Sequence, residues 1–333
     1  MLSETPLLQV QNLSMRFAAP RSLLEWASGT PRRELHAVRD VSFTLAAGET
    51  LGVVGESGCG KSTLGRCLVG LYEPAAGEIL WHGRPLRELG NRQAISRKIQ
   101  MIFQDPYSSL NPRMSLEQTL AETLKVHGLA TTRGERKDRI DELLLTVGLA
   151  PRLKDRLPYA FSGGQRQRIS IARALAVGPE LIVADEPVSA LDASVQAQII
   201  NLFEEIRENL GVAFLFIAHD LSVVRHISQR IAVMYLGQSM EVADTDALFD
   251  SPRHPYTRAL LGAIPRPDPD ERQNGVSLEG ELPNPFNPPK GCAFSTRCPH
   301  VIDACRTSIP PLRKLGATHH ARCLPHILDL RGQ

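Results

Sequence analysis

The stretch that most constrains this chain matches the pattern G-x-x-x-x-G-K-[ST]. Its residues are Gly55, Glu56, Ser57, Gly58, Cys59, Gly60, Lys61, Ser62 and Thr63. An apolar run at residues 51–54 precedes it, and a helical pattern follows it to residue 70. Glycines let successive backbone N–H groups point at one anion, and the positive end of the following helix faces the same anion. The stretch therefore predicts a nucleotide-binding loop between a strand and a helix, with Lys61 on the β- and γ-phosphates and Ser62 on Mg²⁺.

Short apolar runs that favour strands alternate with helical patterns along most of the chain. Strands are expected at residues 7–10, 41–45, 51–54, 78–81, 99–103, 181–184, 212–218, 231–235 and 239–242. Helices are expected at residues 115–147 with a break at Gly128, at 162–176 and at 195–210. This alternation predicts an α/β fold with a doubly wound parallel sheet.

Composition limits the kind of protein this can be. The formal net charge of +2 gives no field that would draw nucleic acid or a lipid surface. No basic segment followed by an apolar one opens the chain, and no uncharged apolar run reaches about 18 residues, so we expect a cytosolic chain. Proline becomes frequent after Asp250. This change predicts a boundary between a domain of residues 1–250 and a small, loop-rich extension of residues 251–333.

Polar side chains follow three of the predicted strands. Gln104 follows the strand at 99–103, Asp185 and Glu186 follow that at 181–184, and His219 follows that at 212–218. Ligands of parallel sheets bind at the carboxyl ends of the strands, so these groups should meet at the phosphates. Hydrolysis of a phosphoanhydride needs neutralised charge and an oriented water. We expect Asp185 at Mg²⁺, and three catalytic residues beside it. Gln104 should sense Mg²⁺ and the water, Glu186 should polarise the water, and His219 should hydrogen-bond the γ-phosphate and the transition-state oxygens.

A second anion site is predicted at the start of the helix at 162–176. It consists of Ser162, Gly163, Gly164 and Gln165. A hydroxyl, two backbone donors and a helix N-terminus can all serve one anion. One chain does not easily fold both sites onto the same γ-phosphate. The simplest geometry is therefore two chains, head to tail, with ATP between them.

This ordered set of motifs resembles the nucleotide-binding subunit of an ABC transporter over about residues 5–250. The resemblance implies a P-loop ATPase with a RecA-like parallel core, an antiparallel β subdomain, and a helical subdomain at about 107–175 that meets a membrane protein. It also implies that Phe17 stacks on adenine, and that residues 189–192 contact the opposite subunit. ATP and Mg²⁺ are the cofactors it implies.

Two stretches after residue 250 narrow the resemblance. Residues 254–261 and 282–298 are similar to the C-terminal extension of bacterial oligopeptide, dipeptide and nickel importer ATPases, and most of all to the second, F-type subunit. The resemblance implies an ATPase for peptide uptake, bound peripherally at the cytoplasmic face of the inner membrane. It implies as partners a different ATPase chain, two membrane permeases and an extracytoplasmic substrate-binding protein, and no nucleic acid.

Two other functions are left open by the motifs. The same role could serve nickel or another small solute, because the cargo is chosen in other chains. A soluble ABC ATPase acting on DNA or the ribosome shares the ATP motifs. Such proteins usually have a long coiled coil or two tandem ATPase domains, and this sequence has neither.

Four of the six cysteines lie close to the end of the chain: Cys292, Cys298, Cys305 and Cys323. Their spacing, C-x5-C-x6-C-x17-C, fits neither the common zinc pattern nor the ferredoxin run. The residues alone leave open a metal centre or plain thiols in a small domain, with His300, His319, His320 and His326 as alternative zinc ligands. Some relatives in the importer family carry a [4Fe–4S] cluster at similar cysteines. The resemblance therefore implies such a cluster here, with Zn²⁺ as the alternative.

Overall fold

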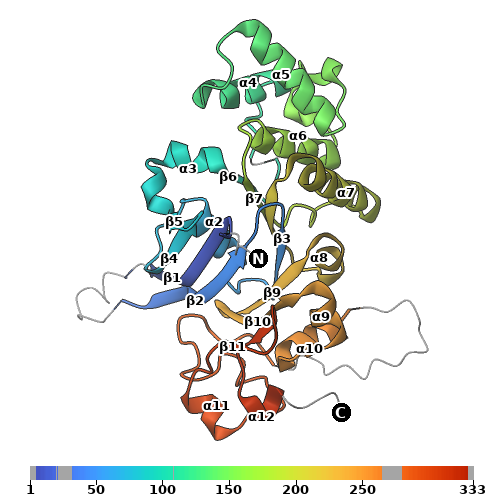
Figure 1. The fold of residues 1–333 in the computed structure, drawn as a ribbon. Helices are drawn as coiled ribbons and strands as arrows, with labels where there is room; N and C mark the ends of the chain where they lie inside the picture. The colour runs from blue at the N-terminus through green and yellow to red at the C-terminus, as the bar shows by residue number, and fades with distance from the viewer. Residues whose placement is uncertain (1–4, 20, 22–31, 108, 265–279, 329–333) are drawn as a thin grey trace.

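The computed structural model describes residues 5–19, 21, 32–107, 109–264 and 280–328. They form two sheets (Figure 1). The larger sheet has the strand order β11-β12-β10-β9-β3-β8-β7-β6, and the smaller has β2-β1-β4-β5. The larger sheet contains β3 (Thr50–Val54), β6 (Ile99–Ile102), β7 (Leu181–Asp185), β8 (Ala213–Ile217), β9 (Arg230–Tyr235), β10 (Gln238–Asp244), β11 (Arg313–Lys314) and β12 (His320–Ala321). The smaller contains β1 (Leu8–Ala18), β2 (Glu34–Leu45), β4 (Ala76–Trp81) and β5 (Arg84–Pro85).

The centre of the larger sheet is parallel. Strands β6, β7, β8, β3 and β9 all run in one direction. Every residue of β3, β7 and β8 is buried. Strands covered on both faces are nearly continuous apolar runs, which is why the sequence predicted all three. The predicted α/β class with a parallel core is confirmed, and β1, β2, β4 and β5 supply the antiparallel part.

The first two strands are longer than the predicted segments at 7–10 and 41–45. They pair with each other from Leu8 opposite Leu45 to Ala18 opposite Glu34. The pairing shifts register between Val10 and Leu13 and twice more before residue 16. Such bulges break the strict alternation by which a half-buried strand is recognised from sequence. The sequence therefore predicted only the start of β1, at residues 7–10, and the end of β2, at residues 41–45.

The helices of the described residues are α2 (Lys61–Leu68), α3 (Arg92–Lys98), α4 (Leu116–Val126), α5 (Arg133–Thr146), α6 (Gly163–Leu175), α7 (Ala193–Leu210), α8 (Leu221–Ile227), α9 (Thr245–Asp250), α10 (Pro255–Gly262), α11 (Asp303–Thr307) and α12 (Pro325–Leu328), with 3-10 turns at Leu86–Leu89, Pro151–Leu153 and Pro158–Ala160. Helices α2, α4, α5, α6 and α7 begin and end close to where the sequence predicts, whereas the other helices were not predicted. The predicted break at Gly128, which has φ 65°, separates α4 from α5. Ser115 and Thr132 begin these two helices with complete capping boxes.

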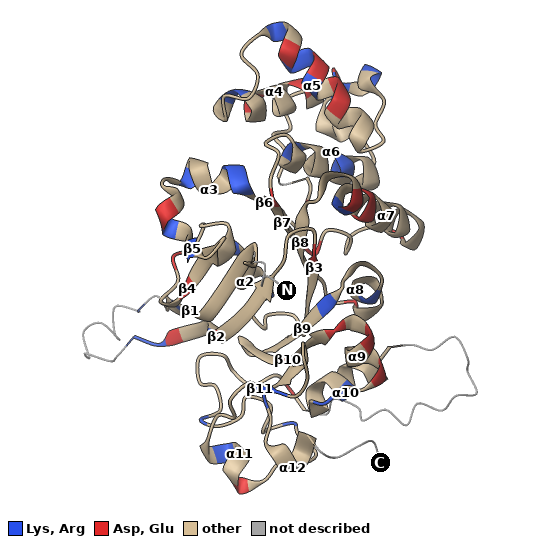
Figure 2. Ribbon diagram, in the orientation of Figure 1, with Lys and Arg blue, Asp and Glu red and all other residues tan. Residues whose placement is uncertain are grey.

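Helix α5 lies at the far end of the helical layer and carries charges of both signs (Figure 2). Its buried side chains are Ile140, Leu143 and Leu144. Most of the other residues of the helix are charged and exposed, with Arg139 paired to Glu142 at 3.0 Å. One apolar stripe therefore packs α5 against α4 and α6, while the opposite face stays in water. The bounds proposed for a helical subdomain, 107–175, stay a prediction.

The residues after 250 are joined to the main sheet. Strand β12 pairs antiparallel with β10, with Glu241 opposite Ala321 and Val242 opposite His320, and β11 extends the edge further. The fully buried Phe294 packs against Tyr235 of β9 and Tyr256 of α10, with 5.3 Å between ring centroids in both pairs. The predicted boundary at 250 coincides with the end of α9, but residues on both sides of it share one apolar core.

Phe294 is expected to be a main contributor to the stability of this junction. Phe294→Ala should lower the free energy of unfolding by about 3–4 kcal/mol, because it removes a fully buried ring and leaves a cavity. Phe286→Ala in the same extension is the control, since that ring is 42% exposed. Urea unfolding followed by tryptophan fluorescence measures both. Equal midpoints for the two variants would contradict the packing argument.

Candidate nucleotide site

The glycine-rich loop joins β3 to α2, as the sequence predicts. Gly60 is the N-cap of α2 and has φ 103°. A Cβ atom at Gly60 would collide with the carbonyl oxygen of Ala37, and one at Gly55 with that of Met234. Neighbouring backbone thus approaches the loop so closely that only glycine fits at both ends.

Lys61, the first residue of α2, is only 4% exposed. Its ammonium group donates to the carbonyl oxygens of Gly55 at 2.8 Å and Glu56 at 3.0 Å. A buried ammonium needs oxygen partners, and here the loop itself supplies them. The lysine therefore curls back across the loop and places a positive charge at its mouth.

Ser62 and Asp185 are brought together from α2 and the end of β7. The Ser62 hydroxyl donates to Oδ1 of Asp185 at 2.8 Å. Burial raises the pKa of the Asp185 carboxyl above its ordinary value, and the Ser62 hydrogen bond opposes this shift. A hydroxyl beside a carboxylate is an oxygen donor set that suits Mg²⁺. The residues present therefore fit the predicted ion.

Glu186 lies between Gln104 and His219, so the ends of β6, β7 and β8 meet as predicted. Gln104 Nε2 donates to Glu186 Oε2 at 3.0 Å. His219 Nδ1 lies 3.4 Å from the same oxygen. The Glu186 side chain is 16% exposed and the His219 side chain 59%. Glu186 also has φ 48°, a conformation uncommon for a residue other than glycine.

A cavity of about 260 Å³ lies at the mouth of the loop. The predicted residues that line it are Phe17, Ser57, Gly58, Gly60, Lys61, Ser62, Thr63, Gln104 and Glu186. Phe17 contacts Tyr72 edge to face, with 5.1 Å between ring centroids. Leu35, His36, Ala37, Leu236, Gly237 and Pro285 complete the lining. No local sequence pattern indicated these six residues, because strand pairing and the fold of the extension bring them there from distant positions.

Five predicted residues lie beside this cavity rather than among its described lining. Gly55 and Glu56 face Lys61 through their carbonyl oxygens, and Asp185 reaches the site through Ser62. His219 lines a small neighbouring cavity that shares Glu186. Cys59 is buried, and burial raises the pKa of its thiol.

The second predicted anion site stands apart from the loop of the same chain. Ser162 caps α6, accepting from the Gln165 N–H at 3.3 Å, while Gln165 Oε1 accepts from the Ser162 N–H at 3.1 Å. Ser162 and Gly163 are exposed, whereas an added Cβ at Gly164 would strike Val195. None of the four is among the described residues lining the 260 Å³ cavity. One chain thus presents the two predicted phosphate sites separately.

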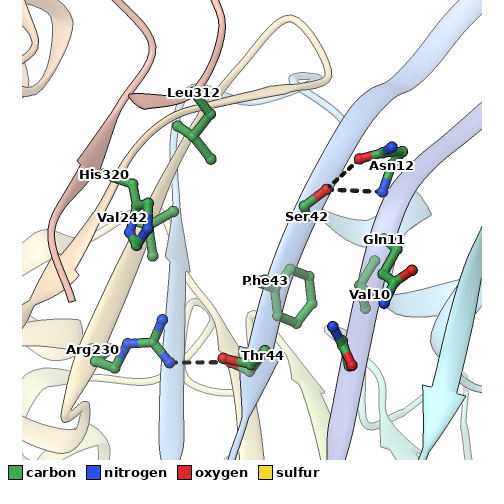
Figure 3. Close-up of a pocket in the computed structure, with 11 residues that line it drawn as sticks. Val10, Gln11, Asn12, Ser42, Phe43, Thr44, Arg230, Val242, Leu312 and His320 are labelled. Atoms are coloured by element: carbon green, nitrogen blue, oxygen red, sulfur yellow. Dashed lines mark hydrogen bonds between the residues drawn. The ribbon is translucent and has the colours of Figure 1, made fainter. Parts of the chain in front are cut away.

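A larger cavity, of about 360 Å³, lies between β1, β2, β10 and the extension (Figure 3). Several of its polar groups are held by hydrogen bonds within the chain. Arg230 donates to the carbonyl oxygen of Thr44 at 3.1 Å and to Glu49 at 3.2 Å, and Ser42 donates to Asn12 at 2.9 Å. The larger volume of this cavity therefore does not make it the candidate nucleotide site. The smaller cavity is the candidate, because Lys61, Ser62, Gln104 and Glu186 converge on it.

The predicted iron–sulfur cluster is wrong. Across the described parts of the chain, no three His, Cys, Asp or Glu side chains are placed to hold a metal ion. Cys292, Cys305 and Cys323 are buried in the apolar core, and all six cysteines are free thiols. Burial raises the pKa of Cys298 to about 11 and that of Cys323 to about 12.

The zinc alternative is contradicted by the same finding. His319 pairs with Glu241 at 2.7 Å, and His320 hydrogen-bonds the carbonyl oxygen of Thr318 at 3.3 Å. His300 belongs to no metal-binding group within the described residues. The side chain of His326 lies outside the described part of the structure.

Comparison with known proteins gives two family-model matches. Residues 38–189 match the model for ABC transporters, and residues 240–305 match that for the oligopeptide/dipeptide transporter C-terminal region. In the described residues, no helix is long and apolar enough to cross a membrane.

The relatives and solved structures agree with these matches. The chain is 50% identical to the putative oligopeptide transport ATP-binding protein YkfD of Bacillus subtilis, over 96% of this chain and 95% of YkfD. It is 52% identical to the oligopeptide transport ATP-binding protein AppF of the same organism, over 87% of this chain and 89% of AppF. The dimeric ATP-binding cassette MJ0796 bound to ADP and Pi is similar in structure, with a TM-score of 0.61 and 27% identity over 72% of this chain and 98% of the cassette. This chain therefore belongs to the ATP-binding proteins of ABC transporters, in the group with the oligopeptide/dipeptide C-terminal region, and it is an ATPase.

Proposed function

We propose that this ATPase energises the uptake of di- and oligopeptides through a membrane importer. The observation that carries the catalytic part is that Lys61, Ser62 and Glu186 line one cavity at the carboxyl ends of the parallel strands, with Asp185 bonded to Ser62. The peptide cargo is supported by the C-terminal family match and by the names of the relatives, which refer to oligopeptides. These names favour peptides over nickel.

The side chains divide the work of hydrolysis. Lys61 and the loop backbone bind the phosphates, and Phe17 packs on the adenine ring. Ser62, Asp185 and Gln104 are the residues that would hold Mg²⁺. Bound Mg²⁺ supplies charge neutralisation at the β- and γ-phosphates. Glu186, held between Gln104 and His219, orients the attacking water, and His219 hydrogen-bonds the γ-phosphate.

The site is completed by a second ATPase chain. Ser162, Gly163, Gly164 and Gln165 lie outside the cavity of their own chain, at the exposed start of α6. A partner placed head to tail brings its own helix start to the γ-phosphate. Closure is then driven by the higher affinity of ATP for the closed pair than for the open one. Two permeases convert this cycle into alternating access, and an extracytoplasmic binding protein delivers the peptide. The ATPase chains attach peripherally at the cytoplasmic face of the membrane.

Uptake by vesicles tests the cargo directly. Right-side-out membrane vesicles that carry this chain with its co-purifying membrane subunits are loaded with ATP, supplied with the binding protein outside, and given a radiolabelled tripeptide or ⁶³Ni²⁺. ATP-dependent accumulation of the tripeptide, abolished by Lys61→Ala, is the expected result. Accumulation of nickel alone would contradict the peptide assignment.

Glu186→Gln is expected to lower the turnover of ATP by about 100-fold or more, because the amide does not accept a proton from the attacking water. ATP binding should persist, so the variant should accumulate as a closed, ATP-bound dimer on size exclusion. Glu208→Gln, a 70% exposed side chain on α7, is the matched control and should keep full turnover. Turnover at the wild-type rate in Glu186→Gln would remove the catalytic assignment.

Lys61→Ala should weaken binding of a fluorescent ATP analogue by about 100-fold, since the charge that faces the phosphates is lost. Titration of the purified full-length chain measures the dissociation constant. The control is Lys137→Ala, which removes the same positive charge from an exposed position on α5 and leaves the site unchanged. Equal affinities for the two variants would show that the loop does not hold nucleotide.

Ser162→Ala should prevent ATP-induced dimerisation in the Glu186→Gln background while leaving nucleotide affinity of the single chain unchanged. Ser115→Ala is the matched control, because Ser115 caps α4 with the same capping box and loses the same kind of hydrogen bond. Sedimentation velocity with and without Mg-ATP distinguishes the two. Dimerisation of both variants to the same extent would argue against a role for the start of α6 in the partner's site.

A further inference from the structure

The C-terminal extension contacts the phosphate-binding loop directly, at a residue 241 positions away in the sequence. Nη1 of Arg297 donates to both carboxylate oxygens of Glu56, at 2.8 Å and 3.0 Å. The Arg297 side chain is 6% exposed and that of Glu56 is 27% exposed. A charge pair this far removed from water is screened much less than one on the surface.

A second contact from the region after residue 250 holds the backbone of the same residue. The N–H of Glu56 donates to the hydroxyl of Tyr256 on α10 at 3.1 Å. The Tyr256 ring packs on Tyr235 with 4.7 Å between centroids, and the Arg297 guanidinium lies 5.9 Å from the centre of the Tyr235 ring. Both contacts to Glu56 therefore start from one packed cluster, which consists of Tyr235, Tyr256, Phe294 and Arg297.

Glu56 also carries the carbonyl oxygen that accepts from the Lys61 ammonium at 3.0 Å. Its N–H, carboxylate and carbonyl thus connect the extension to the lysine of the loop. A phosphate cradle binds tightly only if its donors are already in place, because ordering a loose loop costs free energy at the moment of binding. Pro285, from the same extension, adds one wall of the nucleotide cavity.

We propose that Arg297 is a positioning residue for the phosphate-binding loop, so that the C-terminal extension sets the affinity for ATP. The inference rests on the proposed role of the loop in holding nucleotide. It adds that residues after 250 act on the ATP site, besides any contact they make with other subunits. Arg297 touches no reacting atom and acts through Glu56.

Arg297→Gln is expected to weaken binding of a fluorescent ATP analogue to the full-length chain by about tenfold, which is the usual size of a coupling between buried charged partners. The KM for ATP should rise by a similar factor with little change in kcat, since Glu186 and its partners are untouched. Arg297→Lys should recover part of the affinity because it keeps the charge. Arg306→Gln, an exposed arginine of the same extension, should bind like the wild type.

A double-mutant cycle separates the ion pair from general damage to the extension. Glu56→Gln should weaken binding by the same factor, and Glu56→Gln with Arg297→Gln should weaken it no further. Thermal unfolding without nucleotide identifies any variant that fails to fold. If Arg297→Gln fails to fold, Glu56→Gln and Tyr256→Phe carry the test with the same expected loss.

The outcomes distinguish this inference from the proposed function. The positioning role is overturned, and the ATP site stays in place, if folded Arg297→Gln binds ATP like the wild type while Lys61→Ala loses affinity. Wild-type affinity in the folded replacements Glu56→Gln and Tyr256→Phe has the same meaning. Wild-type affinity in Lys61→Ala overturns both. Strictly additive effects in the double variant overturn the pairing of Arg297 with Glu56 as the cause.

Discussion

A buried ammonium group is the constraint on which the site depends. Lys61 is almost excluded from water and would be unstable there without oxygen partners. Those partners are two consecutive carbonyl oxygens of its own loop, which requires the tight return of the chain between Gly55 and Gly60. Both glycines are closely approached by backbone from other strands. The position of one charge thus fixes the loop, the start of α2, and the edge of the cavity.

The parallel sheet converts distant sequence positions into one reactive cluster. Gln104, Glu186 and His219 follow three strands that lie side by side as β6, β7 and β8. Because parallel strands all end at the same edge, a polar residue after each strand meets the others without any long loop. The hydrogen bond and the close ring contact at Glu186 are consequences of this topology.

The extension shows how burial decides the chemistry of a residue. Four cysteines close together in the sequence, and the resemblance to importer ATPases, suggested a metal centre, but Cys292, Cys305 and Cys323 pack in the apolar core, and the described side chains form no metal-binding group. The same packing brings Arg297, an ordinary arginine in the sequence, onto the phosphate-binding loop. No sequence pattern indicated this contact, because it depends on how the extension packs against the main sheet.

The sequence by itself determined the parallel core, the ends of α2, α4, α5, α6 and α7, the phosphate loop, and the polar residues that follow β6, β7 and β8. These features depend on local patterns: buried apolar runs, capping boxes such as that of Ser115, and glycines at fixed spacing. Only the tertiary structure decided the bulged pairing of β1 with β2, the joining of β12 to β10, and the walls of the nucleotide cavity. It also decided that Cys323 is a core thiol and that Arg297 reaches Glu56. Such contacts join positions tens to hundreds of residues apart, and their free energy comes from burial and pairing that no short stretch of sequence encodes.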